Sequence, residues 1–446
     1  MVLPHFSRPT SPISYNTSMV VDVLVIGSGA REHALAWKLA QSPRIGKLYV
    51  APGNSGTAGI AENVPIEASD LEGLAKFARA KNIGLTVVGP DDVLAMGVVG
   101  LFTARGLRIF GPTKEAAQIE SSKAFSKVLM QEGNIPTAKF AVFNSAAPAL
   151  AYIRTAGVPI VVKASGLALG KGVYVCKTMA EAEQAVKEVM IDRVHKDAGS
   201  EVVVEEYLDG SEVSIHALSD GITYMLFPPA QDHKRALDGD RGNNTGGMGT
   251  IAPVPWVTLP MMSGIESQVV TPTFDAFRKR GAQFKGVLFP GIMMTEDGPK
   301  VLEYNARFGD PETQVYMRLL SSDLLDLLEA CVDGTLFTIR SGVEWNRGFA
   351  ANVVIASGGY PNSYEKGFPI TGIEDAEKVQ DVIVFHAGTK IENGQLVTSG
   401  GRVLSISATG GTLKQALDRA YKAVERIHFK GMQFRTDIGA GALGSE

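Results

Sequence analysis

Residues 301–314 read VLEYNARFGDPETQ, and this stretch carries more information than any other part of the chain. Residues 301–304 have the apolar character of a β-strand. Because side chains alternate between the two faces of a strand, Glu303, Asn305 and Arg307 are expected on one face. Such a set suits Mg²⁺ holding a polyphosphate, with the arginine beside the reacting charge. The spacing alone leaves a second interpretation open, a strand end with an exposed charged face.

The composition is typical of a multidomain globular protein. At 446 residues the chain is expected to form two to four domains. Its 43 basic and 47 acidic residues give a net charge of −4, so nothing indicates a nucleic-acid or membrane partner. No apolar run approaches the ~18 residues that suggest a membrane span. Cys176 and Cys331 are far apart and are expected to be buried reduced thiols, which favours a cytoplasmic enzyme.

Residues 1–18 differ from the rest of the chain. They contain Ser, Thr and Pro but no acidic residue, and Met19 stands directly before the first apolar run. An upstream start codon or a disordered tail is the favoured interpretation, and an organellar transit peptide is the alternative. A protein that starts at Met19 is expected to match the full chain in stability and activity.

Apolar runs alternate with helical patterns from residue 20 to about residue 113, which predicts an α/β domain with a parallel sheet. A helix is expected to start at Lys123 with a serine cap, and a second α/β region follows. Further on, a helical stretch is expected to be interrupted at Pro272. A strand-rich segment begins near residue 348. It ends in an amphipathic helix whose apolar positions are Leu413, Leu417, Tyr421, Val424 and Ile427.

A glycine-rich loop at residues 27–33 lies between a strand and a helix. Free N–H groups at a helix N-terminus suit a phosphate, so a phosphate-bearing substrate is favoured there over a plain tight turn. NAD is disfavoured because Glu32 stands where a third glycine is needed and no acidic residue ends the next strand.

Three other segments could bind an anion or a nucleotide. Residues 163–172 place Lys163 at the end of an apolar strand before a glycine run, although a flexible hairpin tip would look the same. Residues 204–212 form a strand and a bend that could pair with an adenine edge, or simply an acidic strand end. Residues 231–235 and 244–249 combine basic residues with glycines, as in an anion nest.

Together these runs resemble the ATP-grasp superfamily and, within it, the phosphoribosylamine–glycine ligase family. The resemblance extends over residues 20–440 in family order and rests above all on QDHKR, NTGGMG and RFGDPETQ. It implies an α/β and α+β multidomain fold: a parallel α/β domain at 19–120, an ATP-grasp small lobe at 121–208, a large lobe at 209–345 and a β-rich cap at 346–446. It also implies ligation of glycine to 5-phosphoribosylamine with ATP, in purine biosynthesis.

The resemblance further implies the roles of individual residues. Arg307 and Asp310 are the expected catalytic residues, and Glu303 and Asn305 the expected ligands of Mg²⁺ or Mn²⁺. ATP is expected to contact Lys123, Lys163, Gly166, Gly170, Lys171, Gly172, Glu205, Tyr207, Leu208 and Glu212. Glycine and phosphoribosylamine are expected near Gly27, Gly29, Arg31, Glu32, His33, Asp232, Lys234, Arg235, Thr245, Gly246, Gly247, Met248, Gly249 and Glu312.

Several positions depart from the residues usual in the family, among them Ser165, Leu169 and Asn243. The metal and phosphate positions match, so an active enzyme is expected. Two alternatives are another ATP-grasp ligase that joins a carboxylate to an amine, and a non-catalytic nucleotide-binding regulator. The expected assembly is a monomer, with a weak dimer as the alternative.

Overall fold

The computed structural model describes residues 20–168 and 172–444. The predicted tail at residues 1–18 and the expected ATP contacts Gly170 and Lys171 lie outside these ranges. Within them, no helix has the length and apolar character needed to cross a lipid bilayer. Cys176 and Cys331 are both buried and free, as predicted.

The N-terminal sheet is parallel, as the alternating pattern predicted, with the strand order β3-β2-β1-β4-β5. Short α/β connections favour this arrangement because each helix returns the chain to the same end of the sheet. Its elements are β1 (Val21–Gly27), α1 (Ala30–Leu39), β2 (Ile45–Pro52), η1 (Thr57–Gly59), β3 (Glu62–Asn63), α2 (Leu71–Ala80), β4 (Leu85–Val88), α3 (Asp91–Met96), α4 (Val98–Ala104), β5 (Ile109–Phe110) and α5 (Lys114–Ser121).

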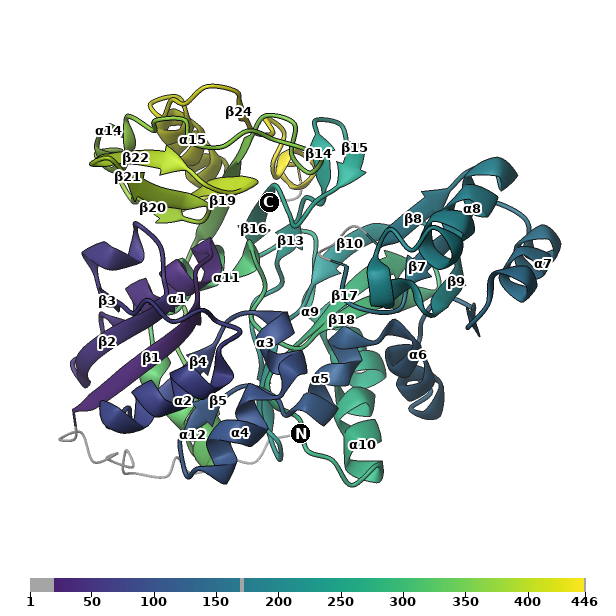
Figure 1. The fold of residues 1–446 in the computed structure, drawn as a ribbon, viewed down its shortest axis with the longest axis horizontal. Helices are drawn as coiled ribbons and strands as arrows, with labels where there is room; N and C mark the ends of the chain where they lie inside the picture. The colour runs from purple at the N-terminus through teal and green to yellow at the C-terminus, as the bar shows by residue number, and fades with distance from the viewer. Residues whose placement is uncertain (1–19, 169–171, 445–446) are drawn as a thin grey trace, which may run out of the picture.

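A small antiparallel sheet follows, in the order β6-β9-β7-β8, and lies far from the N-terminal sheet in Figure 1. The predicted serine cap is present: Ser122 accepts from the backbone N–H of Phe125 at the start of α6. The elements are α6 (Lys123–Glu132), β6 (Phe140–Phe143), α7 (Ala146–Ala156), β7 (Ile160–Ala164), β8 (Val173–Cys176), α8 (Met179–Val186), the π-helix η2 (Lys187–Ile191), η3 (Lys196–Gly199) and β9 (Val202–Glu206).

A third sheet runs β10-β17-β11-β12, with β18 paired to β17. The prediction that the helical stretch is interrupted at Pro272 is wrong. Helix α9, the π-helix η4 and α10 follow one another without a gap, and the proline lies in the first turn of α10, where a missing backbone N–H is tolerated. The elements are β10 (Ser211–Ser214), β11 (Ala217–Asp220), β12 (Tyr224–Leu226), α9 (Leu259–Ile265), η4 (Glu266–Val270), α10 (Thr271–Lys279), β17 (Lys285–Thr295), β18 (Gly298–Asn305), α11 (Glu312–Leu319), α12 (Leu324–Asp333), α13 (Leu336–Ile339) and η5 (Arg340–Gly342).

The fourth sheet contains the C-terminal strands, drawn yellow-green in Figure 1. Strands β13 and β16 from residues 231–252 join it, since β16 pairs antiparallel with β19. The division of the chain at 345/346 stays a prediction, but this sheet extends across it. Its strands are β13 (Gln231–Asp232), β16 (Gly249–Ala252), β19 (Phe349–Ser357), β20 (Val382–His386), β23 (Arg402–Gly410) and β24 (Met432–Gln433). Two separate two-stranded sheets are formed by β14 (Arg235–Leu237) with β15 (Arg241–Asn244), and by β21 (Thr389–Glu392) with β22 (Gln395–Thr398). The helices of this region are α14 (Ile373–Glu377), α15 (Leu413–Val424) and η6 (Ala440–Ala442).

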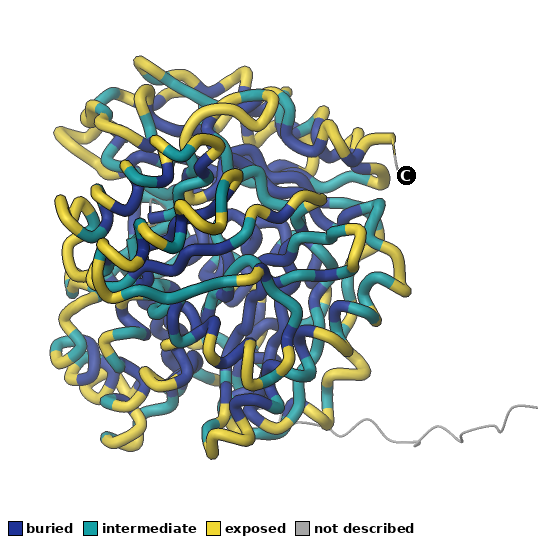
Figure 2. The backbone as a smooth tube through the Cα atoms, turned by 90° about the vertical axis from the view of Figure 1, so that its right-hand side faces the viewer, coloured by how far each residue is buried: buried dark blue, intermediate teal, exposed yellow. Residues whose placement is uncertain are grey.

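The hydrophobic cores show which parts pack together. One cluster joins Val25 and Leu35 of the N-terminal domain to Leu218 and Tyr316 of the third sheet region. The small antiparallel sheet has its own cluster, with Val162 and Val204 among its members. Figure 2 shows the buried backbone concentrated in the interior, with exposed positions mainly at turns. The sheet that carries Lys163 is therefore packed around a core separate from that of the N-terminal domain.

Candidate active site

A β-bulge in β18 determines which way the side chains of Glu303 and Asn305 point. Glu303 pairs with Gly291, whereas the next partner pair is Val301 with Ile292, so Leu302 is the extra residue. As a result Val301 and Tyr304 are buried in the core. Glu303 and Asn305 then share the opposite face, as predicted from the strand pattern. The bulge also frees the Leu302 carbonyl, which accepts from Lys163 Nζ at 2.9 Å.

Two buried lysines surround Glu205. Lys163 Nζ lies 2.9 Å from one carboxylate oxygen, and Lys127 Nζ lies 3.2 Å from the other. Lys127 also donates to Thr137 at 2.6 Å. Burial lowers the pKa of Lys127 to about 8, although Glu205 acts to raise it. Two ammonium groups for one carboxylate leave positive charge beside the cavity, which suits a phosphate.

Lys123 begins helix α6 beside the small sheet. Its backbone N–H donates to Ser165, and its ammonium group donates to the carbonyl of Gly166 at 3.3 Å. Burial lowers the pKa of Lys123. Gly166 has no room for a side chain, because an added Cβ would lie 2.6 Å from the Cα of Ala198. Lys123 therefore contacts, through both its backbone and its side chain, the loop that follows Lys163 in the sequence.

Lys234 connects two acidic residues. Its ammonium group forms ion pairs with Glu212 and, at 3.3 Å, with Glu303. Burial acts to raise the pKa of Glu303, but Lys234, Lys163 and Lys123 outweigh it and hold the value at about 2. Glu303 is therefore ionised at neutral pH, as a metal ligand has to be.

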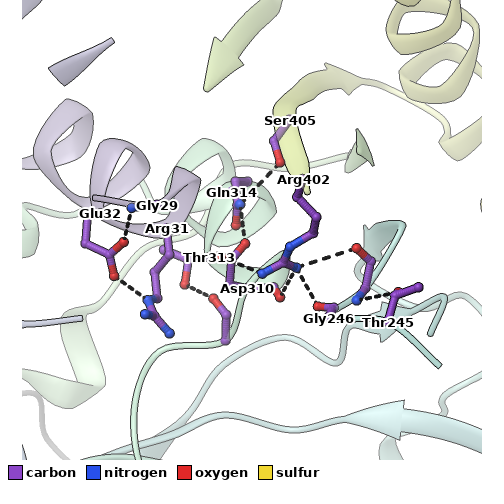
Figure 3. Close-up of polar contacts among 12 residues, drawn as sticks. Gly29, Arg31, Glu32, Thr245, Gly246, Asp310, Thr313, Gln314, Arg402 and Ser405 are labelled. Atoms are coloured by element: carbon purple, nitrogen blue, oxygen red, sulfur yellow. Dashed lines mark hydrogen bonds and ion pairs between the residues drawn. The ribbon is translucent and has the colours of Figure 1, made fainter. Parts of the chain in front are cut away.

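Asp310 is held by Arg402 at the start of β23, a contact that Figure 3 shows in close-up. The guanidinium lies 3.0 Å from the Asp310 carboxylate and donates to the Asp310 carbonyl at 2.7 Å. It also donates to the carbonyl of Gly246. Gln314 donates to the same carboxylate at 2.8 Å. Although burial acts to raise it, Arg402 and Arg31 keep the pKa of Asp310 below its usual value.

Asp232 and Glu312 are two further acidic residues that line the same cavity. Glu312 is buried and accepts from the Ser214 hydroxyl at 3.1 Å, while Asp232 accepts from the backbone N–H of His233 at 2.7 Å. Burial raises the pKa of both groups, and the charge of Glu312 adds to the shift of Asp232. A bound cation would relieve this cost.

The N-terminal loop has a different geometry from the one predicted. Glu32 turns back and accepts from the backbone N–H of Gly29, the N-cap residue of α1, at 2.6 Å. Arg31 pairs with the same carboxylate at 2.6 Å (Figure 3). It also donates to the Phe308 carbonyl at 3.3 Å. The side chain that reaches the cavity is therefore that of Arg31, whereas the N–H of Gly29 already has an acceptor.

His33 lies between the N-terminal domain and the fourth sheet. Its Nδ1 accepts from the backbone N–H of His386 at 2.9 Å. Burial and the neighbouring His386 lower the pKa of His33 to about 3, so the ring is neutral. The structure places His33 in a contact between domains and does not bring it to the cavity.

One cavity of about 1320 Å³ collects most of the predicted site residues. Those that line it are Arg31, Lys123, Lys163, Gly172, Glu205, Tyr207, Leu208, Glu212, Asp232, Lys234, Arg235, Thr245, Gly246, Glu303, Asn305, Arg307, Asp310 and Glu312. Those described residues that do not line it are Gly27, Gly29, Glu32, His33, Gly166, Gly247, Met248 and Gly249. The cavity lies between the small sheet on one side and the third and fourth sheets on the other, so residues from all parts of the chain meet there.

Sequence reasoning missed several residues at or beside this cavity, and four of them contact the predicted site segments. Glu120, Lys127 and Arg402 line it. His216, to which no role was given, is buried behind it and accepts from the backbone N–H of Gly309 at 3.1 Å. Glu120 in α5 and Lys127 in α6 could have been found from the sequence as charged residues on the buried face of an amphipathic helix. Arg402 lies in the short run GGRVL at residues 400–404, but only the fold brings it to Asp310.

The residues at the end of β18 fit a divalent cation bound together with phosphate. They offer an ionised carboxylate, Glu303, and an amide oxygen, Asn305, on one face, and the neighbouring lysines suit the phosphates. Mg²⁺ in such sites commonly takes only one or two protein carboxylates and is otherwise bound by phosphate and water. Among the described residues there is no cluster of three or more His, Cys, Asp or Glu side chains able to hold a metal by themselves.

Solved structures with the same architecture define the fold. A biotin carboxylase from Campylobacter jejuni superposes with a TM-score of 0.71 at 12% identity, covering 94% of each chain, which shows likeness of fold alone. A phosphoribosylamine–glycine ligase from Thermotoga maritima superposes with a TM-score of 0.79 at 34% identity, covering 94% of this chain and 100% of that one. With two lobes around a cavity lined by lysines and carboxylates, the chain has an ATP-grasp fold.

Sequence comparisons give the particular family. Models of phosphoribosylglycinamide synthetase match residues 21–120 with the N domain, 121–313 with the ATP-grasp (A) domain and 350–441 with the C domain. A phosphoribosylamine–glycine ligase from Chlorobaculum tepidum is 49% identical over 94% of this chain and its own full length. A trifunctional purine biosynthetic protein, adenosine-3, from Gallus gallus is 49% identical over 94% of this chain and 42% of its own length. The chain belongs to the phosphoribosylglycinamide synthetase family.

Proposed function

We propose that this chain is an ATP-dependent carbon–nitrogen ligase that joins glycine to 5-phosphoribosylamine, giving glycinamide ribonucleotide, ADP and phosphate in purine biosynthesis. The observation that carries the proposal is the convergence in one cavity of Lys123 and Lys163, the pair Glu303 and Asn305, and Arg307. These are the groups that phosphoryl transfer from ATP to a carboxylate needs. The near full-length similarity to phosphoribosylamine–glycine ligases supports the choice of substrates.

The chemistry first has to make the glycine carboxylate a better electrophile. The γ-phosphoryl group moves to a carboxylate oxygen, the bond to the β-phosphate oxygen breaks, and ADP leaves. The amine of phosphoribosylamine then attacks the carbonyl carbon of glycyl phosphate, the carbon–oxygen bond to phosphate breaks, and the amine loses a proton. Positioning and charge neutralisation account for most of the catalysis in such reactions.

The basic and acidic residues of the cavity have different roles in this reaction. Lys123 and Lys163 neutralise ATP phosphates, and the planar guanidinium of Arg307 faces the transferring group. Glu303 and Asn305 hold the divalent cation, which supplies positive charge to the phosphate oxygens. The carboxylates of Asp232 and Glu312 suit the ammonium group of glycine, because a cation lowers the cost of their burial.

Other parts of the proposal concern binding and assembly. The nucleoside is placed against Glu205, Tyr207, Leu208 and Glu212, and the sugar phosphate of phosphoribosylamine near Arg31. The cation is Mg²⁺ or Mn²⁺, and both are to be compared. The monomeric state and the cytoplasmic location expected from the sequence stay predictions; light scattering after size exclusion tests the first of these.

The test of the proposed function is phosphate release from ATP with each substrate omitted in turn. We expect release to require glycine, freshly made phosphoribosylamine and the divalent cation together, with glycinamide ribonucleotide formed in equal amount. Release supported by another carboxylate and amine, but not by these two, would favour a different ATP-grasp ligase. ATP binding without any turnover would favour the non-catalytic regulator.

A further inference from the structure

Glu120 is a buried acidic residue to which sequence reasoning gave no role. It lies in the last turn of α5, whose start is capped by the hydroxyl of Thr113. The C-terminal end of a helix carries partial negative charge, so a carboxylate is unfavourable there and a cation is preferred. Burial adds a further cost and raises the pKa of Glu120 to about 7, against the opposing charge of Arg307. Glu120 therefore stabilises neither the end of α5 nor the core around it.

Both carboxylate oxygens of Glu120 contact the segment that follows β18. One oxygen lies 2.9 Å from an Nη of Arg307, and the other accepts from the backbone N–H of Ala306 at 2.7 Å. The carboxylate thus binds the side chain of Arg307 and the backbone N–H of the residue directly before it. The bond from the Ala306 N–H fixes the carboxylate itself, so that the ion pair holds the guanidinium against a group that is already fixed in place.

The other contacts of Arg307 are weaker. It donates to the Asn305 side-chain oxygen at 3.1 Å and to the Phe308 carbonyl at 3.3 Å, and its buried Nε has no hydrogen-bond partner. Glu120 is its ion-pair partner, and the charged groups that also act on Glu120 are Asp91, Arg31 and Lys123. Because arginine has several rotatable bonds, losing this pair would let the guanidinium adopt other directions.

We propose that Glu120 is a positioning residue: it holds Arg307 in the direction needed to meet the transferring phosphoryl group, and it does so from the N-terminal domain. The inference rests on the proposed function, since it assigns Arg307 to that group. Glu120 acts through Arg307, so its removal lowers the rate of the chemical step without weakening the binding of ATP.

A double-mutant cycle of Glu120→Gln and Arg307→Lys tests this inference. In the wild-type background, we expect Glu120→Gln to lower kcat about tenfold to a hundredfold while KM for MgATP changes less than about twofold. In the Arg307→Lys background, Glu120→Gln should lower kcat less than about threefold, because the guanidinium that Glu120 holds in place is already absent. Glu120→Asp, which keeps the charge, should recover part of the rate.

The matched control is Glu132→Gln on the next helix, which removes an exposed ion pair with Arg280 and should leave kcat unchanged. Thermal melting of each variant separates misfolding from a loss of rate. An equal loss of kcat in both backgrounds, a loss confined to KM for MgATP, or no loss at all would overturn the proposal. If the wild type uses a different carboxylate substrate, the proposed function fails, and the same cycle with that substrate still tests Glu120.

Discussion

At the scale of single residues, the strand pattern predicted correctly that Glu303 and Asn305 share a face of β18, but the strand ends at Asn305, so Arg307 does not continue that face as predicted. It could not predict the bulge at Leu302, because the extra residue depends on the partner strand β17. Nor could it predict that Lys234 would pair with Glu303, since these residues are 69 positions apart. A short stretch of sequence thus predicts which residue types form a site, whereas the side chains that they pair with depend on the fold.

Glu303→Gln and Asn305→Ala are each expected to lower turnover at saturating metal by at least about a hundredfold. Glu303→Gln removes the negative charge and one of the two oxygens of the carboxylate ligand, and Asn305→Ala removes the amide oxygen, while the strand keeps its backbone pairing. Melting temperatures should stay within about 3 °C of the wild type. The control is Asp297→Asn in the turn of the same hairpin, which removes an exposed ion pair with Lys300. Near-normal turnover in either variant would contradict the metal assignment.

Arg307→Lys is expected to lower kcat about a hundredfold or more while the affinity for ATP changes little. An ammonium group cannot span two oxygens of a transferring phosphoryl group as a planar guanidinium does. Separate measurements of kcat and the Kd for MgATP check this, with Arg280→Lys at an exposed ion pair as the control. A variant that lost only ATP affinity would show that Arg307 binds the ground state.

At the scale of elements, the parallel N-terminal sheet and the serine-capped α6 were predictable, because their patterns are local. The pairing of β16 with β19 was not, since it joins residues about a hundred positions apart through backbone hydrogen bonds. That pairing places the segments at 231–235 and 244–249 beside the fourth sheet and within reach of Arg402. The position of these two segments at the cavity is therefore set by a sheet whose strand pairing the local sequence does not predict.

The contact between α1 and β20 should make stability depend on pH through His33. An unfolded histidine takes up a proton near pH 6.5, but folded His33 does so only near pH 3. Below pH 6.5 the unfolded state binds more protons, so stability falls as the pH falls toward 3. His33→Asn keeps an acceptor for the N–H of His386 but does not titrate.

Denaturant titrations between pH 6.5 and pH 4.5 measure this effect. The free energy of unfolding of the wild type should fall more steeply than that of His33→Asn, by up to about 1.4 kcal/mol per pH unit. His428→Asn is the control, because the isolated His428 is exposed. Identical slopes for the wild type and His33→Asn would show that His33 takes up its proton at the same pH in the folded and unfolded states.

At the scale of the whole molecule, the fold class expected from the sequence is confirmed, and the site lies where the parts of the chain meet. The small sheet supplies Lys163, the N-terminal domain supplies Arg31 and Glu120, and the fourth sheet supplies Arg402. A motif search identifies such residues one at a time. Their convergence in one cavity follows only from the packing of the domains, which joins the N-terminal domain and the third sheet in one core.

The central claim is that the carboxylate of glycine is activated by phosphoryl transfer within this cavity, and an oxygen-isotope experiment tests it most directly. The protein is incubated with ATP, phosphoribosylamine and glycine whose two carboxylate oxygens are ¹⁸O, and the phosphate released is analysed by mass spectrometry. One labelled oxygen is expected in each phosphate, because the bond that breaks in the second step joins the carbonyl carbon to that oxygen. Unlabelled phosphate, formed while glycinamide ribonucleotide accumulates, would contradict the account.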